Sequence, residues 1–430
     1  MNLASWLQTI QALHPVEIDL GLDRVRRVAD SLGLSRPAPI VITVAGTNGK
    51  GSCVALLQQV LLAAGYRTGA YTSPHIHCYN ERLQLDGMMV SDAQLCTSFA
   101  AVEAARQAVS LTYFEFGTLS ALYLMEQAKP DVAILEVGLG GRLDAVNIID
   151  ADVCVISQIG VDHTDWLGPD RESIGREKAG IFRSAVPVVC GEPEPPVSLL
   201  EHALQLHAPI HLLGRDYGFD SGSDNHWSWW GQERDGASAA LARLPATILA
   251  TDHAATVIQV LKLLPLDISL AALELGISTA RLAGRFELLN SDKNRQMVLL
   301  DVAHNPSAAE RLALGLLRYR QEHPGTDKIA AVLAIMADKD VEGFCQALAS
   351  EVNIWYIAQV DQPRAMQAQK LAELLDSMGL TRFPTVFADP ADAYRTALET
   401  SHPRDLILVT GSFFTVAAVR GYLTGLGTGS

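Results

Sequence analysis

Short apolar, β-branched runs alternate with longer segments of helical periodicity over most of the chain. The run 39–45 predicts a fully buried strand, and the segment 52–64 predicts a helix that ends at Gly65. The same pattern recurs downstream, with strands expected at 131–137, 152–159 and 186–189, and helices at 91–109, 117–127 and 171–179. This alternation is typical of a mostly parallel sheet that is covered by helices on both faces.

The alternation is interrupted once and then begins a second series. Residues 217–236 are polar and aromatic and predict a twisted hairpin, whose three tryptophans more often cap an apolar face than form a stacking platform. The polar stretch 290–295 is the best boundary candidate, and the tail 424–430 is expected to fray. Helices are expected at 252–264 and 269–275, and the second series of strands at 297–301, 328–335, 353–358, 385–387 and 405–409.

Composition narrows the class of protein. The 430 residues are 49% hydrophobic and 19% charged, so large cores can be buried and wholesale disorder is excluded. With 33 Lys and Arg against 48 Asp and Glu, the net charge of −15 argues against nucleic-acid and anionic-membrane partners, but not against a small anionic ligand. The six cysteines are scattered, and neither a signal peptide nor a transmembrane run is visible. We therefore expect free thiols and a cytoplasmic location.

The sharpest chemical signal is the glycine-rich sequence 45–52, which lies between a buried strand and a helix. Its glycines let backbone N–H groups approach phosphate oxygens, Lys50 can reach the outer phosphates, and the helix N-terminus adds partial positive charge. Gly51 stands between Lys50 and Ser52, which departs from the usual Walker spacing, and an ordinary glycine-rich turn is the alternative.

We expect an α/β fold with a P-loop-containing, mostly parallel sheet domain at 1–287 and a smaller Rossmann-like domain at 288–430.

Further polar residues follow other predicted strands. Glu136 ends one strand, where a carboxylate can hold Mg²⁺ beside a phosphate loop, or can simply cap the glycine-rich turn that follows. His163 follows the next strand, although a lone histidine is more often structural. The position of Lys178 in a predicted helix is by itself typical of a solvated residue. Asp301 and His304 either bind a ribose or phosphate or form a helix N-cap and its neighbour. Both possibilities remain open on spacing alone.

Together these motifs resemble the folylpolyglutamate synthases of the Mur ligase superfamily. The similarity runs from about Trp6 to Val416, and the sequences 19–22 and 111–115 are most similar to the bifunctional bacterial branch, which also makes dihydrofolate. The motifs that carry it are 46–52, Thr72-Ser73-Pro74-His75, 136–144, Asp162-His163-Thr164, Arg176-Glu177-Lys178-Ala179-Gly180, 301–306 and Gly411-Ser412-Phe413.

The resemblance implies a set of ligand contacts. The expected ATP contacts are Thr47, Asn48, Gly49, Lys50, Gly51, Ser52, His253, Arg285 and Asp301. The expected Mg²⁺ ligands are Ser73, Glu136 and His163, with Lys178 N-carboxylated to help hold a second ion, and K⁺ is a further candidate. The expected dihydropteroate or folate contacts are Asp19, Leu20, Gly21, Leu22, Thr112, Tyr113, Phe114, Glu115, Leu143, Asp144 and Ala145. Lys50, Lys178 and His304, the last as a base, would act catalytically.

Four positions depart from the family pattern. His253 stands where the family usually has an adenine-side asparagine, and Ala337 replaces a common histidine. Val146 and Ala283 replace a common threonine and proline. None of these changes removes a phosphate-binding or metal-binding group.

The resemblance implies an ATP-dependent ligase that adds L-glutamate to dihydropteroate and to reduced folates through an acyl phosphate. One alternative is a monofunctional folylpolyglutamate synthase, and another is a non-catalytic ATP-binding switch protein. A cell-wall Mur ligase is disfavoured, because it usually carries a UDP-binding domain before the phosphate loop and only 45 residues precede Gly46. We expect a monomer with small-molecule partners only.

Overall fold

The computed structural model describes residues 1–222, 226–291, 296–381 and 384–425, which form two compact units. The first unit contains Met1–His75 and Tyr79–Arg281, and the second contains Ile76–Cys78 and Leu282–Ser430. The boundary expected at 287/288 between independent domains stays a prediction. Parts of the stretch 290–295 and of the tail 424–430 lie outside the described residues.

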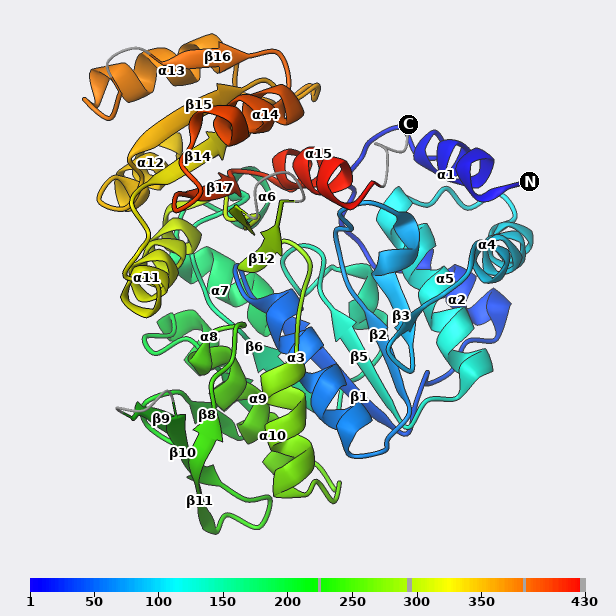
Figure 1. Ribbon diagram of the computed structural model, residues 1–430. Coiled ribbons are helices and arrows are strands. Elements are labelled where there is room, and N and C mark those ends of the chain that lie inside the picture. Colours follow the sequence, from blue (N-terminus) through cyan, green and yellow to red (C-terminus); the bar gives the residue numbers. More distant parts are fainter. Residues whose placement is uncertain (223–225, 292–295, 382–383, 426–430) are drawn as a thin grey trace. The chain divides into compact units, whose positions relative to one another are not determined.

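The first unit is built on one large sheet (Figure 1). In its described part, eight strands follow the order β4-β3-β2-β5-β1-β6-β7-β8, and all neighbours from β2 to β8 pair in parallel. Strands β3 and β4 add an antiparallel edge. The strands are β1 Ile40–Ala45, β2 Thr68–Tyr71, β3 Leu83–Leu85, β4 Met88–Met89, β5 Val132–Glu136, β6 Val153–Ile156, β7 Val188–Cys190 and β8 Ile210–Leu212.

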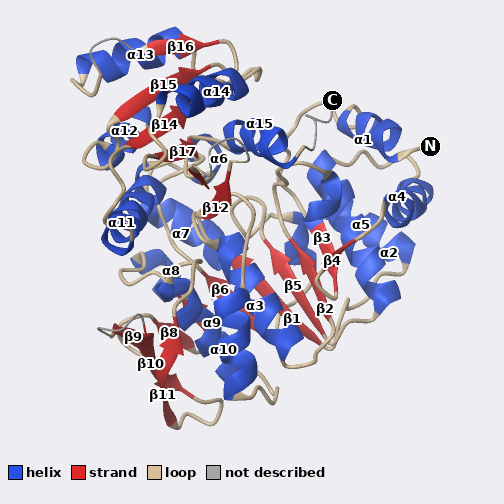
Figure 2. Ribbon diagram, in the orientation of Figure 1, coloured by secondary structure: helices blue, strands red, loops and turns tan. Residues whose placement is uncertain are grey.

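Helices cover this sheet, as Figure 2 shows with helices in blue and strands in red. Both faces of the central strand β1 are buried, because Val41 and Ala45 as well as Ile42 and Val44 have no exposed surface. The near-continuous apolar run of β1 is the pattern of a doubly covered parallel strand. The helices are α1 Leu3–Gln11, α2 Asp23–Leu32, α3 Lys50–Ala63, α4 Asp92–Arg106, α5 Tyr113–Ala128, α6 Thr164–Leu167, α7 Arg171–Ala179, α8 Val197–Gln205, α9 Thr251–Leu263 and α10 Leu270–Thr279, with 3₁₀ turns at Tyr79–Arg82 and Ala145–Ile148.

Helix α5 begins four residues earlier than the periodicity of residues 117–127 predicts. Its N-cap is Thr112, whose side chain accepts a hydrogen bond from Glu115 N, while Glu115 accepts one from Thr112 N. This reciprocal pair is a capping box, which satisfies two backbone donors of the first turn. The signal was present in the sequence as Thr-x-x-Glu, and it places residues 113–115 in the first turn of a helix.

The aromatic segment forms a small antiparallel sheet of the order β11-β10-β9, from the strands β9 Gly218–Ser221, β10 His226–Gln232 and β11 Ser238–Pro245. Trp227 and Trp229 are buried, and Trp229 donates a hydrogen bond from its indole nitrogen to the carbonyl of Ala255 on α9. The interpretation of these two tryptophans as packing residues is therefore confirmed.

The second unit contains its own sheet, of the order β12-β13-β17-β14-β15-β16. The predicted second series of strands is confirmed, and an antiparallel edge strand, β12, pairs with β13 and was not predicted. Its strands are β12 Glu287–Asn290, β13 Met297–Leu300, β14 Ile329–Leu333, β15 Ile354–Ala358, β16 Thr385–Phe387 and β17 Leu406–Thr410. Its helices are α11 Pro306–Glu322, α12 Val341–Leu348, α13 Ala368–Ser377, α14 Pro390–Thr400 and α15 Phe413–Thr424.

The fold class expected from the sequence is confirmed in both units, each an α/β arrangement around a mainly parallel sheet. No helix among the residues described here is long and apolar enough to cross a membrane.

Candidate active site

The glycine-rich loop joins β1 to α3, which begins at Lys50. Gly46 and Gly49 have φ angles of 151° and 85°, and a Cβ at Gly46 would overlap the hydroxyl of Ser157. That hydroxyl donates a hydrogen bond of 2.6 Å to the carbonyl of Asn48. The loop therefore needs glycine both for its left-handed backbone and for the close approach of Ser157.

The imidazole of His253 packs directly on this loop, because a Cβ at Gly49 would overlap the ring. His253 is buried on α9. The structure therefore brings His253, predicted as an ATP contact despite its departure from the family pattern, against the loop predicted to hold the phosphates.

Thr47 connects the glycine-rich loop to the segment that follows β6. Its backbone N–H donates to the carbonyl of Gln158 at 2.6 Å. Its hydroxyl donates to the carbonyl of Gly160 at 3.0 Å and accepts from the N–H of Gly160 at 3.1 Å. The two loops are thus hydrogen-bonded to each other, and residue 163 lies three positions beyond the second contact.

Lys50 curls back over the loop, where its Nζ donates to the carbonyls of Gly46 at 2.9 Å and Thr47 at 3.2 Å. It occupies the first turn of α3, where the unpaired backbone N–H groups of the helix favour anions. The structure thus brings together the lysine, the helix terminus and the glycine backbone that the sequence predicts as phosphate contacts.

Glu136 ends β5, beside the start of the glycine-rich loop, because it is in register with Val44 of β1. Its side chain is buried, and its Oε2 accepts a hydrogen bond of 3.2 Å from the backbone N–H of Ser73. Two of the predicted metal ligands, Ser73 and Glu136, are therefore neighbours.

The glycine-rich turn after Glu136 is held by Asp144. Its two carboxylate oxygens accept from the N–H of Leu139 at 2.9 Å and of Val146 at 3.0 Å. Burial raises the pKa of Asp144 to about 6, although these amides act in the opposite direction. Asp144 therefore caps this turn.

Lys178 is buried, with 3% of its surface exposed, so the interpretation as a solvated helix residue is wrong. Burial lowers the pKa of Lys178 to about 7, and the nearby charge of Lys50 contributes to the shift. A Cβ at Gly141 would lie 2.7 Å from the carbonyl oxygen of Glu177 and 2.9 Å from that of Lys178. Only glycine permits this close approach of the turn after β5 to α7.

His163 is the N-cap of α6 and has a left-handed backbone, with φ 53° and ψ 42°. This conformation costs a non-glycine residue on the order of 1 kcal/mol and is often found at functional sites. Asp162 accepts a hydrogen bond of 2.8 Å from the N–H of His163.

The predicted metal ligands fit Mg²⁺ by their chemistry. The carboxylate of Glu136, the hydroxyl of Ser73 and a carbamate on Lys178 would supply the oxygen donors that Mg²⁺ prefers. Within the described ranges, no three His, Cys, Asp or Glu side chains converge as a metal cluster. The predicted set contains only Glu136 and His163 of those types, so it relies on other donors.

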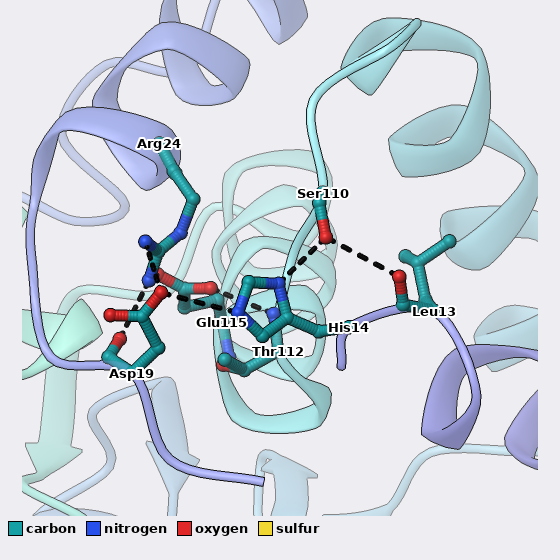
Figure 3. Close-up of polar contacts among 7 residues, drawn as sticks. All are labelled: Leu13, His14, Asp19, Arg24, Ser110, Thr112 and Glu115. Atoms are coloured by element: carbon teal, nitrogen blue, oxygen red, sulfur yellow. Dashed lines mark hydrogen bonds and ion pairs between the residues drawn. The ribbon is translucent and has the colours of Figure 1, made fainter. Parts of the chain in front are cut away.

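The predicted acceptor-binding residues at 19–22 and 112–115 meet around Arg24 (Figure 3). Arg24 bonds to the side chain of Asp19 at 2.6 Å and to that of Glu115 at 3.0 Å. Phe114 covers Gly138, where a Cβ would lie 2.6 Å from its ring, and its centroid lies 6.0 Å from that of Tyr71. Leu22 is the N-cap of α2, while Leu143 and Ala145 flank Asp144 in the turn after β5.

Three further predicted residues, Arg285, Asp301 and His304, lie in the second unit. Asp301 follows β13 and accepts from the N–H of Phe286 and of Ala303, both at 2.9 Å. Burial raises the pKa of Asp301, and the charge of Arg285 opposes this shift. The N-cap of α11 is Asn305, so neither Asp301 nor His304 has the capping role considered for them.

Arg285 and His304 both lie near the ring of Phe413. The guanidinium carbon of Arg285 is 5.5 Å from the ring centroid, and the imidazole centroid is 6.2 Å from it. His304 Nδ1 lies 2.8 Å from the carbonyl oxygen of Val302. The second unit therefore holds a cation, a carboxylate and an imidazole in one cluster.

Two protein-family models match the chain, the Mur ligase middle domain at residues 44–190 and the Mur ligase, glutamate ligase domain at residues 284–413. The dihydrofolate synthase/folylpolyglutamate synthase of Escherichia coli strain K12 is 45% identical over 417 residues, which cover 97% of this chain and 94% of the relative. The chain belongs to the dihydrofolate synthase/folylpolyglutamate synthase family. The relative from Haemophilus influenzae is 40% identical and covers 96% of both chains.

Solved structures of this family agree with the fold. E. coli FolC in complex with DHPP and ADP has a TM-score of 0.91 and 43% identity, covering 99% of this chain and 98% of that chain. The bifunctional folylpolyglutamate synthase/dihydrofolate synthase of Yersinia pestis, complexed with AMPPNP and Mn ion, has a TM-score of 0.90 at 44% identity and the same coverage. The chain is an ATP-dependent ligase with the two activities of its family.

Sequence reasoning missed two supporting residues of this dihydrofolate synthase/folylpolyglutamate synthase site. Ser157 directly follows β6, so its position after a buried strand was a usable signal. Arg24 gave no signal, because its partners lie 5 and 91 residues away along the chain.

We predict that Ser157→Ala raises the KM for ATP about 3- to 10-fold, the effect of losing one buried hydrogen bond to the phosphate loop. Steady-state kinetics measures this change. The control is Ser98→Ala, which removes a buried hydroxyl bonded to Ser120 on α5 and leaves the phosphate loop intact. An unchanged KM for ATP in folded Ser157→Ala protein would contradict the assigned role.

Proposed function

We propose that the loops after β1, β5 and β6 activate the carboxylate of dihydropteroate or of a reduced folate by phosphorylation. The observation that carries this proposal is the glycine-rich loop between β1 and α3, where Lys50 lies over the carbonyls of Gly46 and Thr47 and Glu136 ends the neighbouring strand. DHPP, ADP, AMPPNP, Mn and L-glutamate accompany solved relatives, which supports the same ligand classes for this chain.

In this reaction the acceptor carboxylate attacks the γ-phosphorus of ATP and ADP leaves. The α-amine of L-glutamate then attacks the acyl carbon, and inorganic phosphate leaves as the amide forms. Phosphoryl transfer depends mainly on positioning and charge neutralisation. Lys50 and the N-terminus of α3 supply both to the transferred phosphate. Mg²⁺ held by Ser73, Glu136 and His163 would neutralise further phosphate charge when bound.

The amine of glutamate must be neutral to attack, which requires a base. We assign this role to His304, whose Nδ1 faces the carbonyl of Val302 at 2.8 Å. An N–H donated there fixes the tautomer in which Nε2 carries the lone pair. Arg285 and Asp301 are the proposed nucleotide contacts of the second unit. The monomeric state and the K⁺ site stay predictions.

Lys178 is proposed to carry a carbamate, which forms when its neutral amine attacks the carbon of CO₂ and one proton of the amine is released to solvent. A neutral amine is uncommon at pH 7, because an ordinary lysine is protonated. Burial and the nearby charge of Lys50 lower the pKa of Lys178 and thereby favour its neutral amine. The change converts a cation into an anion with two oxygen donors, suited to a second Mg²⁺.

The test of function is a ligase assay with MgATP and L-glutamate, and with either dihydropteroate or a reduced folate as acceptor. We expect ADP and an amide product with both acceptors. Product from the folate alone would favour the monofunctional alternative. ATP binding without turnover would favour the switch protein. The absence of amide product with both acceptors would contradict the ligase assignment.

The carbamate predicts a dependence on pH and CO₂. Below pH 7 the amine of Lys178 is mostly protonated and cannot attack CO₂, so carbamate and activity should be lost as the pH falls through about 7. Removal of CO₂ from the buffer should increase this loss. Bicarbonate at pH 8 should restore both. A ¹³C NMR carbamate signal from ¹³C-bicarbonate checks this, and Lys178→Ala should lack the signal and most activity.

The matched control is Lys262→Ala, which removes a lysine that pairs with Glu233 in the same unit. It should keep normal activity and the carbamate signal. Near-normal rates in folded Lys178→Ala protein would refute the carbamate role.

A further inference from the structure

Arg24 joins two segments that are far apart in the sequence. Its Nη1 donates to Asp19 Oδ2 at 2.6 Å, and its Nη2 donates to the backbone carbonyl of Asp19 at 2.6 Å. The same Nη2 donates to Glu115 Oε1 at 3.0 Å (Figure 3). One guanidinium therefore ties the loop between α1 and α2 to the first turn of α5.

The pairing with Glu115 is the more buried half of this contact. The side chain of Glu115 is 5% exposed, against 27% for Arg24 and 39% for Asp19. Burying a carboxylate is costly unless it has a cationic partner or strong hydrogen bonds. Glu115 has both, because its second oxygen accepts from the N–H of Thr112 at 2.7 Å.

His14 makes a second connection between the same segments. Its Nε2 lies 3.2 Å from Asp19 Oδ2, and its Nδ1 lies 2.6 Å from Ser110 Oγ. Ser110 also donates to the carbonyl of Leu13 at 3.3 Å. The loop that carries Asp19 is thus attached at both its beginning and its end to residues 110–115.

The turn that Arg24 holds also carries aromatic side chains. Phe114 lies over Gly138, at the start of the turn that follows Glu136. Tyr113 packs edge-on against Tyr79, with ring centroids 5.7 Å apart. A shift of the first turn of α5 would therefore move an aromatic surface as well as the carboxylate of Glu115.

We propose that Arg24 is a positioning residue that sets the site for the pterin-bearing aromatic acid, by fixing Asp19 and the turn 112–115 at one separation. The inference rests on the proposed acceptor contacts at 19–22 and 112–115. Arg24 acts through these residues and does not touch the reacting carboxylate. Its loss weakens acceptor binding and leaves the phosphate loop unaffected.

An arginine is required at this position because it has several donors in a fixed fork. Nη1 and Nη2 serve two carboxylates and one carbonyl at once. The ammonium of a lysine is a compact charge that cannot span these acceptors with the same geometry. A lysine at position 24 would therefore restore only part of the acceptor binding that the arginine supports.

The test compares Arg24→Gln with the wild-type enzyme in steady-state kinetics, with dihydropteroate and with a reduced folate. We expect the KM for both acceptors to rise about 10-fold or more, with kcat and the KM for ATP within about 2-fold. The control is Arg320→Gln, because Arg320 is 30% exposed and likewise forms an ion pair with a carboxylate, that of Glu351, and donates to a backbone carbonyl, but in the second unit. It should leave all constants unchanged.

Two further variants keep the proposal open to refutation if Arg24→Gln fails to fold. Arg24→Lys should give an intermediate KM for the acceptors. The pair Arg24→Met with Glu115→Gln removes both charges but keeps an acceptor for the N–H of Thr112, and should still raise that KM. A normal acceptor KM in this folded double variant, or equal rises in the KM values for ATP and acceptor, would overturn the proposal. A wild-type enzyme without turnover would instead refute the proposed function.

Discussion

The site depends on the parallel alignment of β1, β5 and β6. Val44 is in register with Glu136, and Ala45 with Ile156, so three strands end side by side. Open α/β sheets bind their ligands outside the carboxyl ends of adjacent parallel strands. The glycine-rich loop, Glu136 and the loop that carries His163 are therefore brought together by the pairing of adjacent strands. The hydrogen bonds between Thr47 and Gly160 then hold two of these loops together.

An acidic protein binds anionic substrates here because its electrostatics are local. The net charge is −15, yet Lys50 and Lys178 lie close enough for one to lower the pKa of the other. Burying a lysine is costly unless the group becomes neutral or is paired. The carbamate proposed for Lys178 would resolve this cost by turning the second cation into a metal ligand. The net charge disfavours polyanionic partners, while Lys50 supplies positive charge locally at the glycine-rich loop.

Periodicity predicted β1, β5, β6 and β7 of the first sheet and the parallel strands of the second, because these patterns depend on residues adjacent in the chain. The short strands β2, β3, β4 and β8 of the described sheet were not predicted. The start of α5 was misplaced because the capping box of Thr112 and Glu115 was not recognised. The burial of Lys178 could not be deduced locally, since it arises where the turn at Gly141 packs on α7. Arg24 was missed because its partners come from other segments. Its environment exists only in the folded chain.

The central claim is that the acceptor carboxylate is activated as an acyl phosphate. It is tested most directly with dihydropteroate labelled with ¹⁸O in both carboxyl oxygens. In an acyl-phosphate mechanism the oxygen that attacks the γ-phosphorus departs with it, so mass spectrometry should find one ¹⁸O in each inorganic phosphate formed. Inorganic phosphate without label, accompanied by normal amide product, would contradict the account.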